Sequence, residues 1–176
     1  NWASSQETMS ANDKIRLLKR DSYAEALAMS ICNSTETRAE ANFKLIPVGN
    51  WVLTDFATVA LFADWRNRFS RFFLKQVVAN HENALAYLKT KADPTNNSVI
   101  FLIKDKTDQT VGHIGLSHVD GDSAELDNVL LGHSPGIENF MDSVENYLLE
   151  WANSYLGIKY MHLRVLSFNF LAIQLH

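Results

Sequence analysis

Three apolar segments separated by short turns constrain the fold of this chain more than any other feature. Residues 98–105 ("SVIFLIKD") are rich in β-branched side chains, and apolar segments at 110–120 and 123–131 follow closely. The intervening "KTDQ" and "GD" are turn sequences, and connections this short join antiparallel neighbours. The sequence therefore predicts a three-stranded antiparallel meander over residues 98–131.

The clearest helix follows the meander, from about residue 137 to residue 156. Aromatic and aliphatic side chains recur there at helical spacing, and Gly157 provides a C-terminal stop. The other predicted elements are strands at 43–48 and 160–167, and helices at 11–31 (broken near Asp21), 55–65 (capped by Thr54), 80–91 and 169–176. This order predicts an α+β fold, with a mixed, mostly antiparallel sheet flanked by helices.

The composition fits one globular domain and argues against several classes of function. The 176 residues are 47% hydrophobic, which suffices for a substantial core. The formal charge is −4 and Lys and Arg form no block, so nothing indicates nucleic acid or a membrane as a partner. The single cysteine, Cys32, rules out an internal disulfide framework and indicates a reducing compartment, so we expect a cytoplasmic protein.

The segment between the meander and the long helix has the composition of an anion site. It contains Gly132 and Gly136, with His133, Ser134 and Pro135 between them. Main-chain N–H groups at a helix start attract negative charge, and glycine lets the backbone approach a ligand closely. Such a turn can bind phosphate without a basic side chain. Glycines that serve only the turn are the alternative.

The order of elements and several short motifs resemble the GNAT superfamily of N-acetyltransferases. The similarity rests on "VGHIGLSHVDGDSAELDNVLLG", on "ENYLLEWANSYLGIKYMHLRVLSFNFLAIQLH" and on "FADWRN". The last motif is similar to one in ribosomal-protein N-terminal acetyltransferases and amino-sugar acetyltransferases. The resemblance covers residues 43–176 and implies a GNAT-like acyl-CoA N-acyltransferase fold that is incomplete at its C-terminus. Residues 1–42 would then be a helical extension or the remnant of a preceding segment.

The resemblance implies acetyl-CoA as co-substrate and no metal. In the family the pyrophosphate lies on the turn before the long helix, where Leu131 here replaces the usual basic residue. The strand before the turn holds the pantetheine arm, and one of its N–H groups polarises the thioester carbonyl. The corresponding cofactor-binding residues are Asn128, Val129, Leu130, Leu131, Gly132, His133, Ser134, Gly136, Ile137 and Asn169.

Three residues are candidates for proton transfer. Glu125 and Asp127 are two positions apart on a strand, so alternation puts both on one face, and either can act as base. The family position favours Glu125, and an exposed strand carboxylate is the alternative for each. His176 stands where many members carry the tyrosine that protonates the departing thiolate, and an imidazole can donate a proton near neutral pH.

The histidines of the meander do not predict a metal site. His113 and His118 are five residues apart on one strand, so alternation would direct them to opposite faces.

Trp65, Arg66 and Asn67 lie where the family forms part of its acceptor pocket. A ring beside a guanidinium suits a polar, ring-shaped or carboxylate-bearing acceptor, and a core tryptophan with a surface arginine is the alternative. The function implied is acetyl transfer from acetyl-CoA to a primary amine of a small molecule, an amino sugar or a sugar nucleotide. A protein N-terminal acetyltransferase and a catalytically degraded binding or assembly module stay open as alternatives, and so does homodimer formation.

Overall fold

A mixed β-sheet forms the centre of the computed structural model, which describes residues 9–32, 43–69, 80–164 and 170–175. In this part of the chain the sheet has seven strands, and their order in space follows their order in the sequence. All neighbours are antiparallel except β5 and β6, which are joined through α6 and run parallel. The strands are β1 (Ile31–Cys32), β2 (Phe43–Pro47), β3 (Val99–Asp105), β4 (Thr110–Asp120), β5 (Ser123–Leu131), β6 (Tyr160–Arg164) and β7 (Phe170–Gln174).

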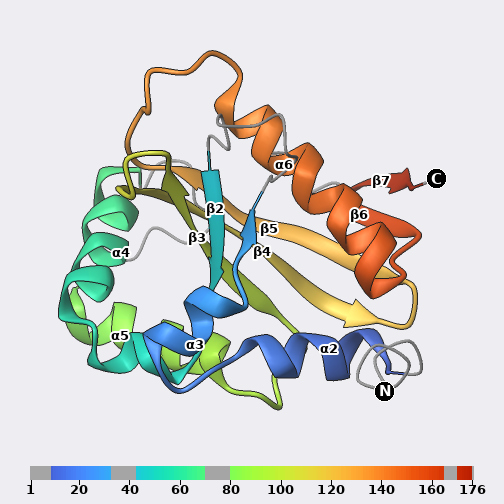
Figure 1. The fold of residues 1–176 in the computed structure, drawn as a ribbon, viewed down its shortest axis with the longest axis horizontal. Helices are drawn as coiled ribbons and strands as arrows, with labels where there is room; N and C mark the ends of the chain where they lie inside the picture. Colours follow the sequence, from blue (N-terminus) through green and yellow to red (C-terminus); the bar gives the residue numbers. More distant parts are fainter. Residues whose placement is uncertain (1–8, 33–42, 70–79, 165–169, 176) are drawn as a thin grey trace.

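Helices cover both faces of the sheet, with α4 and α5 on one side and α6 on the other (Figure 1). The helices are α2 (Ala11–Leu18), α3 (Tyr23–Ala28), α4 (Phe56–Arg68), α5 (His81–Ala92) and α6 (Phe140–Trp151), with a 3₁₀ turn at Asn50–Thr54 and a π-helical stretch at Ala152–Leu156. Among the described helices, none has the length and apolar character needed to cross a bilayer.

Alternation along the central strands divides the core into two layers. On β3, Phe101 and Ile103 belong to the layer beneath α2 and α6, whereas Ile100 and Leu102 belong to the layer beneath α4 and α5. All four side chains are at most 1% exposed. This two-sided burial explains why residues 98–105 are a continuous apolar run rather than an alternating one. The predicted α+β fold and the predicted meander are confirmed.

Short polar side chains set the starts of four helices. Ser10, Ser22, Asp55 and Asn80 each accept a hydrogen bond from the main-chain N–H three residues further on. The predicted cap at Thr54 is therefore one residue early, because the carboxylate of Asp55 performs that role.

The helix predicted at residues 169–176 is wrong, because Phe170–Gln174 forms strand β7 instead. This strand pairs antiparallel with β6, from Tyr160↔Gln174 to Arg164↔Phe170. A short apolar run fits a helix or a strand equally well by pattern, and here the main-chain edge of β6 decides between them. The predicted strand at 160–167 is confirmed as far as Arg164.

The N-terminal segment contributes to the same core as the rest of the chain. Ile15 and Leu18 of α2 and Ile31 of β1 belong to the buried layer beneath α6. Two hydrogen bonds add to this packing, from Lys14 Nζ to the Tyr155 carbonyl at 2.6 Å and from the Tyr147 hydroxyl to the Cys32 carbonyl at 2.7 Å. The boundary predicted at residue 43 therefore does not separate residues 9–32 from this layer.

A glycine contact joins α4 to the end of the meander. Trp65 of α4 is 2% exposed, and a Cβ atom added to Gly132 would overlap its indole ring. Gly132 directly follows β5, and both its N–H and that of His133 donate to the Val111 carbonyl, at 2.8 and 3.0 Å. The absence of a side chain at Gly132 thus lets the chain leave β5 against the face of a buried ring.

Truncation of Ile15 tests whether α2 is part of the core. We expect Ile15→Ala to lower the free energy of unfolding by about 2–5 kcal/mol, because the buried side chain leaves a cavity. Urea denaturation of the purified protein measures this change, and Leu27→Ala, at a position 37% exposed, is the control. Equal, small effects of both variants would show that α2 is dispensable for stability.

Substitution of Gly132 tests the contact with Trp65. We expect Gly132→Ala to destabilise the protein by about 1–3 kcal/mol, because the added methyl group overlaps a ring held in the core. Thermal unfolding measures the loss. In a Trp65→Phe background the same substitution should cost less, since the smaller ring leaves room; an unchanged cost would contradict this explanation.

Candidate active site

The described pairing between β5 and β6 ends at Leu126, and this point, here called the fork, is the first part of the candidate site. Parallel pairing between the two strands ends at Leu126↔Leu163. β5 stays paired with β4 as far as Leu131. Among the described residues, the opposite edge of β5 beyond Leu126 has no partner strand, and Val129 on it is 40% exposed. An extended ligand can therefore hydrogen-bond to the main chain of the predicted pantetheine-binding residues Asn128–Leu131.

A β-bulge at Asn128 lies directly beyond the fork. Asn128 has a φ of 53°, and between the pairs His113↔Leu130 and Gly115↔Asp127 the register advances three residues on β5 for two on β4. The His113 ring donates from Nδ1 to the Asn128 carbonyl, 2.6 Å away. Because a carbonyl oxygen only accepts, this bond requires the tautomer with a proton on Nδ1.

His113 is a buried neutral imidazole. It is 5% exposed and stacks on Phe62 of α4, with ring centroids 4.5 Å apart. Burial lowers the pKa of His113 to about 4, although the bond to the Asn128 carbonyl favours the charged form. The ring therefore supports the bulge as a neutral hydrogen-bond donor and is not a proton shuttle near neutral pH.

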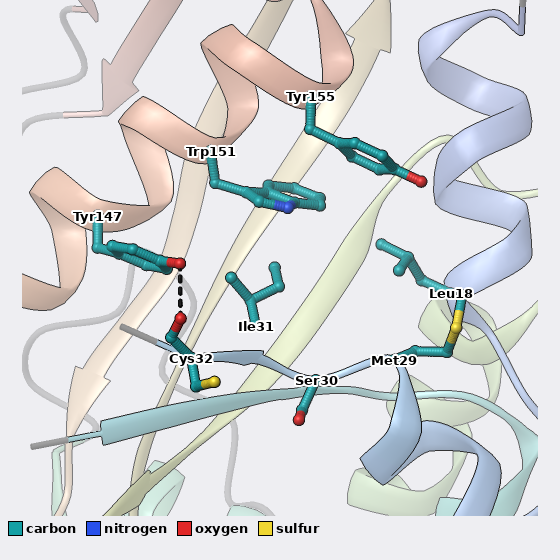
Figure 2. Close-up of a pocket in the computed structure, with 8 residues that line it drawn as sticks. All are labelled: Leu18, Met29, Ser30, Ile31, Cys32, Tyr147, Trp151 and Tyr155. Atoms are coloured by element: carbon teal, nitrogen blue, oxygen red, sulfur yellow. Dashed lines mark hydrogen bonds between the residues drawn. The ribbon is translucent and has the colours of Figure 1, made fainter. Parts of the chain in front are cut away.

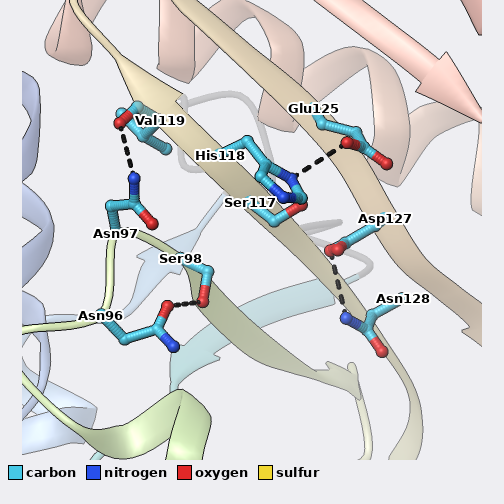
Figure 3. Close-up of polar contacts among 9 residues, drawn as sticks. All are labelled: Asn96, Asn97, Ser98, Ser117, His118, Val119, Glu125, Asp127 and Asn128. Carbon is cyan, nitrogen blue, oxygen red and sulfur yellow. Dashed lines mark hydrogen bonds and ion pairs between the residues drawn. The ribbon is translucent and has the colours of Figure 1, made fainter.

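Side chains from α4 and α5 complete a polar cluster around the bulge. The hydroxyl of Tyr87, on α5, donates to Asn128 Oδ1 at 2.8 Å. Asn128 Nδ2 in turn donates to Asp127 Oδ1 at 3.1 Å, as Figure 3 shows. The guanidinium of Arg66, on α4, lies over the Tyr87 ring, 5.2 Å from its centroid. The cluster thus joins two helices to the strand that forms the fork.

The two predicted carboxylates share one face of β5. Ala124 and Leu126 point into the core layer beneath α6, so Glu125 and Asp127 point to the side of α4 and α5. Gly115 lies opposite Asp127 on β4, and a Cβ there would come within 3.1 Å of Asp127 Oδ1. The missing side chain leaves room for this carboxylate above β4.

Glu125 has a different partner from Asp127. Its Oε2 lies 3.0 Å from His118 Nδ1, and Glu125 is 7% exposed (Figure 3). The expectation that His118 and His113 face opposite sides is wrong, because a second bulge at His118, with φ of 49°, turns its ring toward Glu125. Within the described residues, no group of three or more His, Cys, Asp or Glu side chains could hold a metal.

The predicted pyrophosphate turn is longer than the sequence suggested. α6 begins at Phe140 rather than near Ile137, and its N-cap residue, Asn139, has a φ of 57°. The N–H of Gly136 donates to Ser134 Oγ at 3.3 Å, and those of Gly132 and His133 donate to Val111. Several donors of the turn are thus engaged within the chain, which differs from the open main-chain cradle expected.

The three predicted acceptor residues have different environments. Trp65 is 2% exposed and packs against Gly132, so its ring is not available to an acceptor in this structure, as the alternative of a core tryptophan expects. Arg66 reaches the polar cluster through Tyr87, whereas Asn67 is exposed near the end of α4. The predicted residues Asn169 and His176 lie outside the described residues.

A hollow on the other side of the sheet is a weaker candidate. It has a volume of about 330 Å³ and lies between α6 and the N-terminal segment, where Tyr147, Trp151 and Tyr155 face Ile31 and Cys32 (Figure 2). Its lining combines aromatic and aliphatic side chains with Ser30 and Cys32, and contains no carboxylate or imidazole. The fork, by contrast, combines an unpaired strand edge with carboxylates, which acyl-transfer chemistry needs.

Tyr87 and His113 are site residues that the sequence did not reveal as such. Tyr87 lies on a predicted helix, 41 residues before its partner Asn128, and nothing in the local pattern connects them. The spacing of His113 and His118 bears only on metal binding and does not indicate a bond from His113 to Asn128. The pair Asp127-Asn128 within a strand was the available signal, because an asparagine there favours the positive φ of a bulge.

The buried state of His113 predicts a pH-dependent stability. Its pKa is about 4 in the folded protein and close to the ordinary 6.5 after unfolding, so only the unfolded chain binds the proton between these values. The stability due to this group is present above pH 6.5 and is lost as the pH falls to 4, by about 3 kcal/mol in all. Urea unfolding of wild type and His113→Phe across this range measures it. A constant difference between the two proteins would contradict it.

Comparison with known proteins gives a family and a set of structural relatives. The family model "Acetyltransferase (GNAT) domain" matches residues 48–176. Among curated proteins, no significant relative is found by sequence. A nucleotide-linked sugar GNAT, FdhC, superposes with a TM-score of 0.56 at 15% identity, covering 70% of this chain and 69% of its own.

Two further structures show the same fold. The microcin C7 self-immunity acetyltransferase MccE, in complex with acetyl-CoA and AMP, superposes with a TM-score of 0.55 at 17% identity. Spermidine N-acetyltransferase from Vibrio cholerae gives a TM-score of 0.53, also at 17% identity. Each comparison covers 72% of this chain and 71% of the other. With a family model that spans most of its length and a fold that agrees, this chain belongs to the GNAT acetyltransferase family.

Proposed function

We propose that this chain transfers an acetyl group from acetyl-CoA to a primary amine of a small molecule. The observation that carries the proposal is the fork, where pairing with β6 ends at Leu126 and, within the described residues, β5 presents an unpaired main-chain edge beside two carboxylates. Main-chain N–H groups suit the thioester carbonyl, whose oxygen gains negative charge during acyl transfer. Carboxylates suit the proton of the attacking amine.

The residues around the fork fit an acyl-CoA in extended form. The edge of β5 from Asn128 to Leu131 would bind the pantetheine arm as an added strand does. The pyrophosphate would lie at the turn before α6, where Ser134 and the main chain after His133 supply the donors. Leu131 offers no guanidinium there, so we expect a main-chain-dominated site with modest affinity.

The carboxylates have a defined task in the reaction. The amine lone pair attacks the thioester carbon, a C–N bond forms, and the C–S bond breaks with its electron pair leaving on sulfur. Asp127 or Glu125 takes the proton that nitrogen loses, directly or through water, and passes it on so that the thiolate leaves as a thiol. The products are the N-acetylated amine and CoA.

The proposed acceptor is a polar amine, with an amino sugar or a sugar nucleotide as the first class to test. Similarity to the nucleotide-linked sugar GNAT supports this class. Arg66 at the polar cluster would suit a phosphate or carboxylate on the acceptor, since its guanidinium binds such groups bidentately. The similar spermidine N-acetyltransferase makes polyamines the matched comparison in the same screen.

Binding and transfer are tested in sequence. Isothermal titration with acetyl-CoA should show one binding event that CoA also gives, because the proposed contacts are to the shared pantetheine and pyrophosphate. Thiol release is then measured with amino sugars, sugar nucleotides, polyamines and peptides with a free N-terminus. We expect release above the acceptor-free background with one of the first two classes.

The possible outcomes separate the alternatives. Transfer only to peptides would favour a protein N-terminal acetyltransferase. Binding of acetyl-CoA without transfer to any amine would favour a binding module. This is the second candidate because the N–H groups of Gly132 and His133 already donate to the Val111 carbonyl rather than pointing to a ligand. No heat at high acetyl-CoA concentration would overturn the proposal.

A further inference from the structure

Three side chains at the bulge form a hydrogen-bond relay with a defined direction. A carboxylate only accepts, so Asn128 must present its NH₂ group to Asp127 and its oxygen to Tyr87. Tyr87 must then be the donor, because the amide oxygen has no proton. The relay therefore runs from the Tyr87 hydroxyl through the Asn128 amide to Asp127 Oδ1. When Tyr87 donates to the oxygen of the Asn128 amide, it polarises that amide, and the Asn128 NH₂ group becomes a stronger donor to Asp127.

The surroundings keep this relay in place. Tyr87 is held on α5, with the Arg66 guanidinium and the Lys91 ammonium 5.2 and 5.7 Å from its ring centroid. Burial raises the pKa of Tyr87, so the hydroxyl keeps its proton at neutral pH. The main chain of Asn128 is fixed separately by His113, and Gly115 leaves the space that the Asp127 carboxylate occupies.

Position at the fork distinguishes the two carboxylates. Glu125 pairs with His162 of β6, inside the closed part of the sheet, and its Oε2 contacts His118. The last pair between β5 and β6 is Leu126↔Leu163, and Asp127 is the next residue on β5, with its side chain on the face toward α4 and α5. It therefore lies beside the edge of β5 that has no partner strand among the described residues, where the thioester would bind.

We propose that Asp127 is the proton acceptor and that Tyr87 is a positioning residue, which holds this carboxylate at the fork through the side chain of Asn128. The inference rests on the proposed acetyl transfer. With one oxygen held by Asn128, the carboxylate presents the other to the nitrogen of the acceptor. That oxygen receives the proton released when the C–N bond forms and the C–S bond breaks, and returns it to the departing sulfur through water.

The kinetic test uses a double-mutant cycle. Tyr87→Phe keeps the ring and removes the hydroxyl, and we expect kcat to fall about tenfold, as for the loss of one hydrogen bond, with KM for acetyl-CoA unchanged. Asn128→Gly removes the amide and tolerates the φ of 53°. Adding Tyr87→Phe to Asn128→Gly should cause no further loss, because the relay is already broken.

Two comparisons complete the kinetic test. Asp127→Asn should lower kcat by about a hundredfold or more, while Glu125→Gln lowers it less. Tyr23→Phe on α3, where the ring packs on Trp51 instead, is the matched control and should leave kcat unchanged. Additive losses in the cycle would show a packing role for Tyr87, and a larger loss in Glu125→Gln than in Asp127→Asn would overturn the assignment of Asp127.

A spectroscopic measurement that does not depend on enzyme activity tests the relay separately from the proposed function. In ¹⁵N NMR spectra, Tyr87→Phe should shift the side-chain NH₂ resonances of Asn128 and speed their exchange with water. Unchanged resonances would overturn the relay even if the wild type transfers acetyl groups. If the wild type transfers none, the proposed function fails, and the assignment of Asp127 as proton acceptor fails with it.

Discussion

The bulge at Asn128 is the constraint on which the candidate site depends. A strand with a positive φ and one extra residue changes its direction at that point. β5 stays paired with β4 on both sides of the bulge, whereas its described pairing with β6 ends at Leu126, two residues before Asn128. The side chains that stabilise the bulge come from β4 and α5, so the helical layer over this face helps to fix where β5 bends.

The two layers of the core have different tasks around this opening. The layer beneath α2 and α6 is apolar along the meander and gives the sheet a rigid back. On the opposite face, the apolar packing of α4 and α5 ends at β4 and β5, where Ser117, Glu125 and Asp127 take the positions that alternation would give to apolar residues. A polar group on a half-buried strand needs a partner, and Asn128 and His118 supply partners for the two carboxylates.

Features that follow from local pattern were predictable, and those that depend on distant partners were not. The meander has short turns that fit antiparallel strands, and α6 has strong helical periodicity. The predictions for residues 98–131 and for the body of the long helix therefore agree with the structure. Residues 170–174 have no such pattern, and the edge of β6 made them a strand. The shared face of Glu125 and Asp127 follows from alternation alone. His118 does not follow the alternation, because residue spacing does not reveal the bulge at that position. Tyr87 could not be identified, since its role exists only once α5 packs beside β5.

The agreement between strand order in space and strand order in the chain has a consequence for how this domain is assembled. Among the connections that the structure describes in full, those from β3 to β4 and from β4 to β5 are short turns, whereas the connection from β5 to β6 encloses α6. Loop closure therefore costs more entropy for the pairing of β6 with β5 than for the two pairings of the meander. The contact that defines one side of the fork thus forms at a greater entropic cost than the meander beside it.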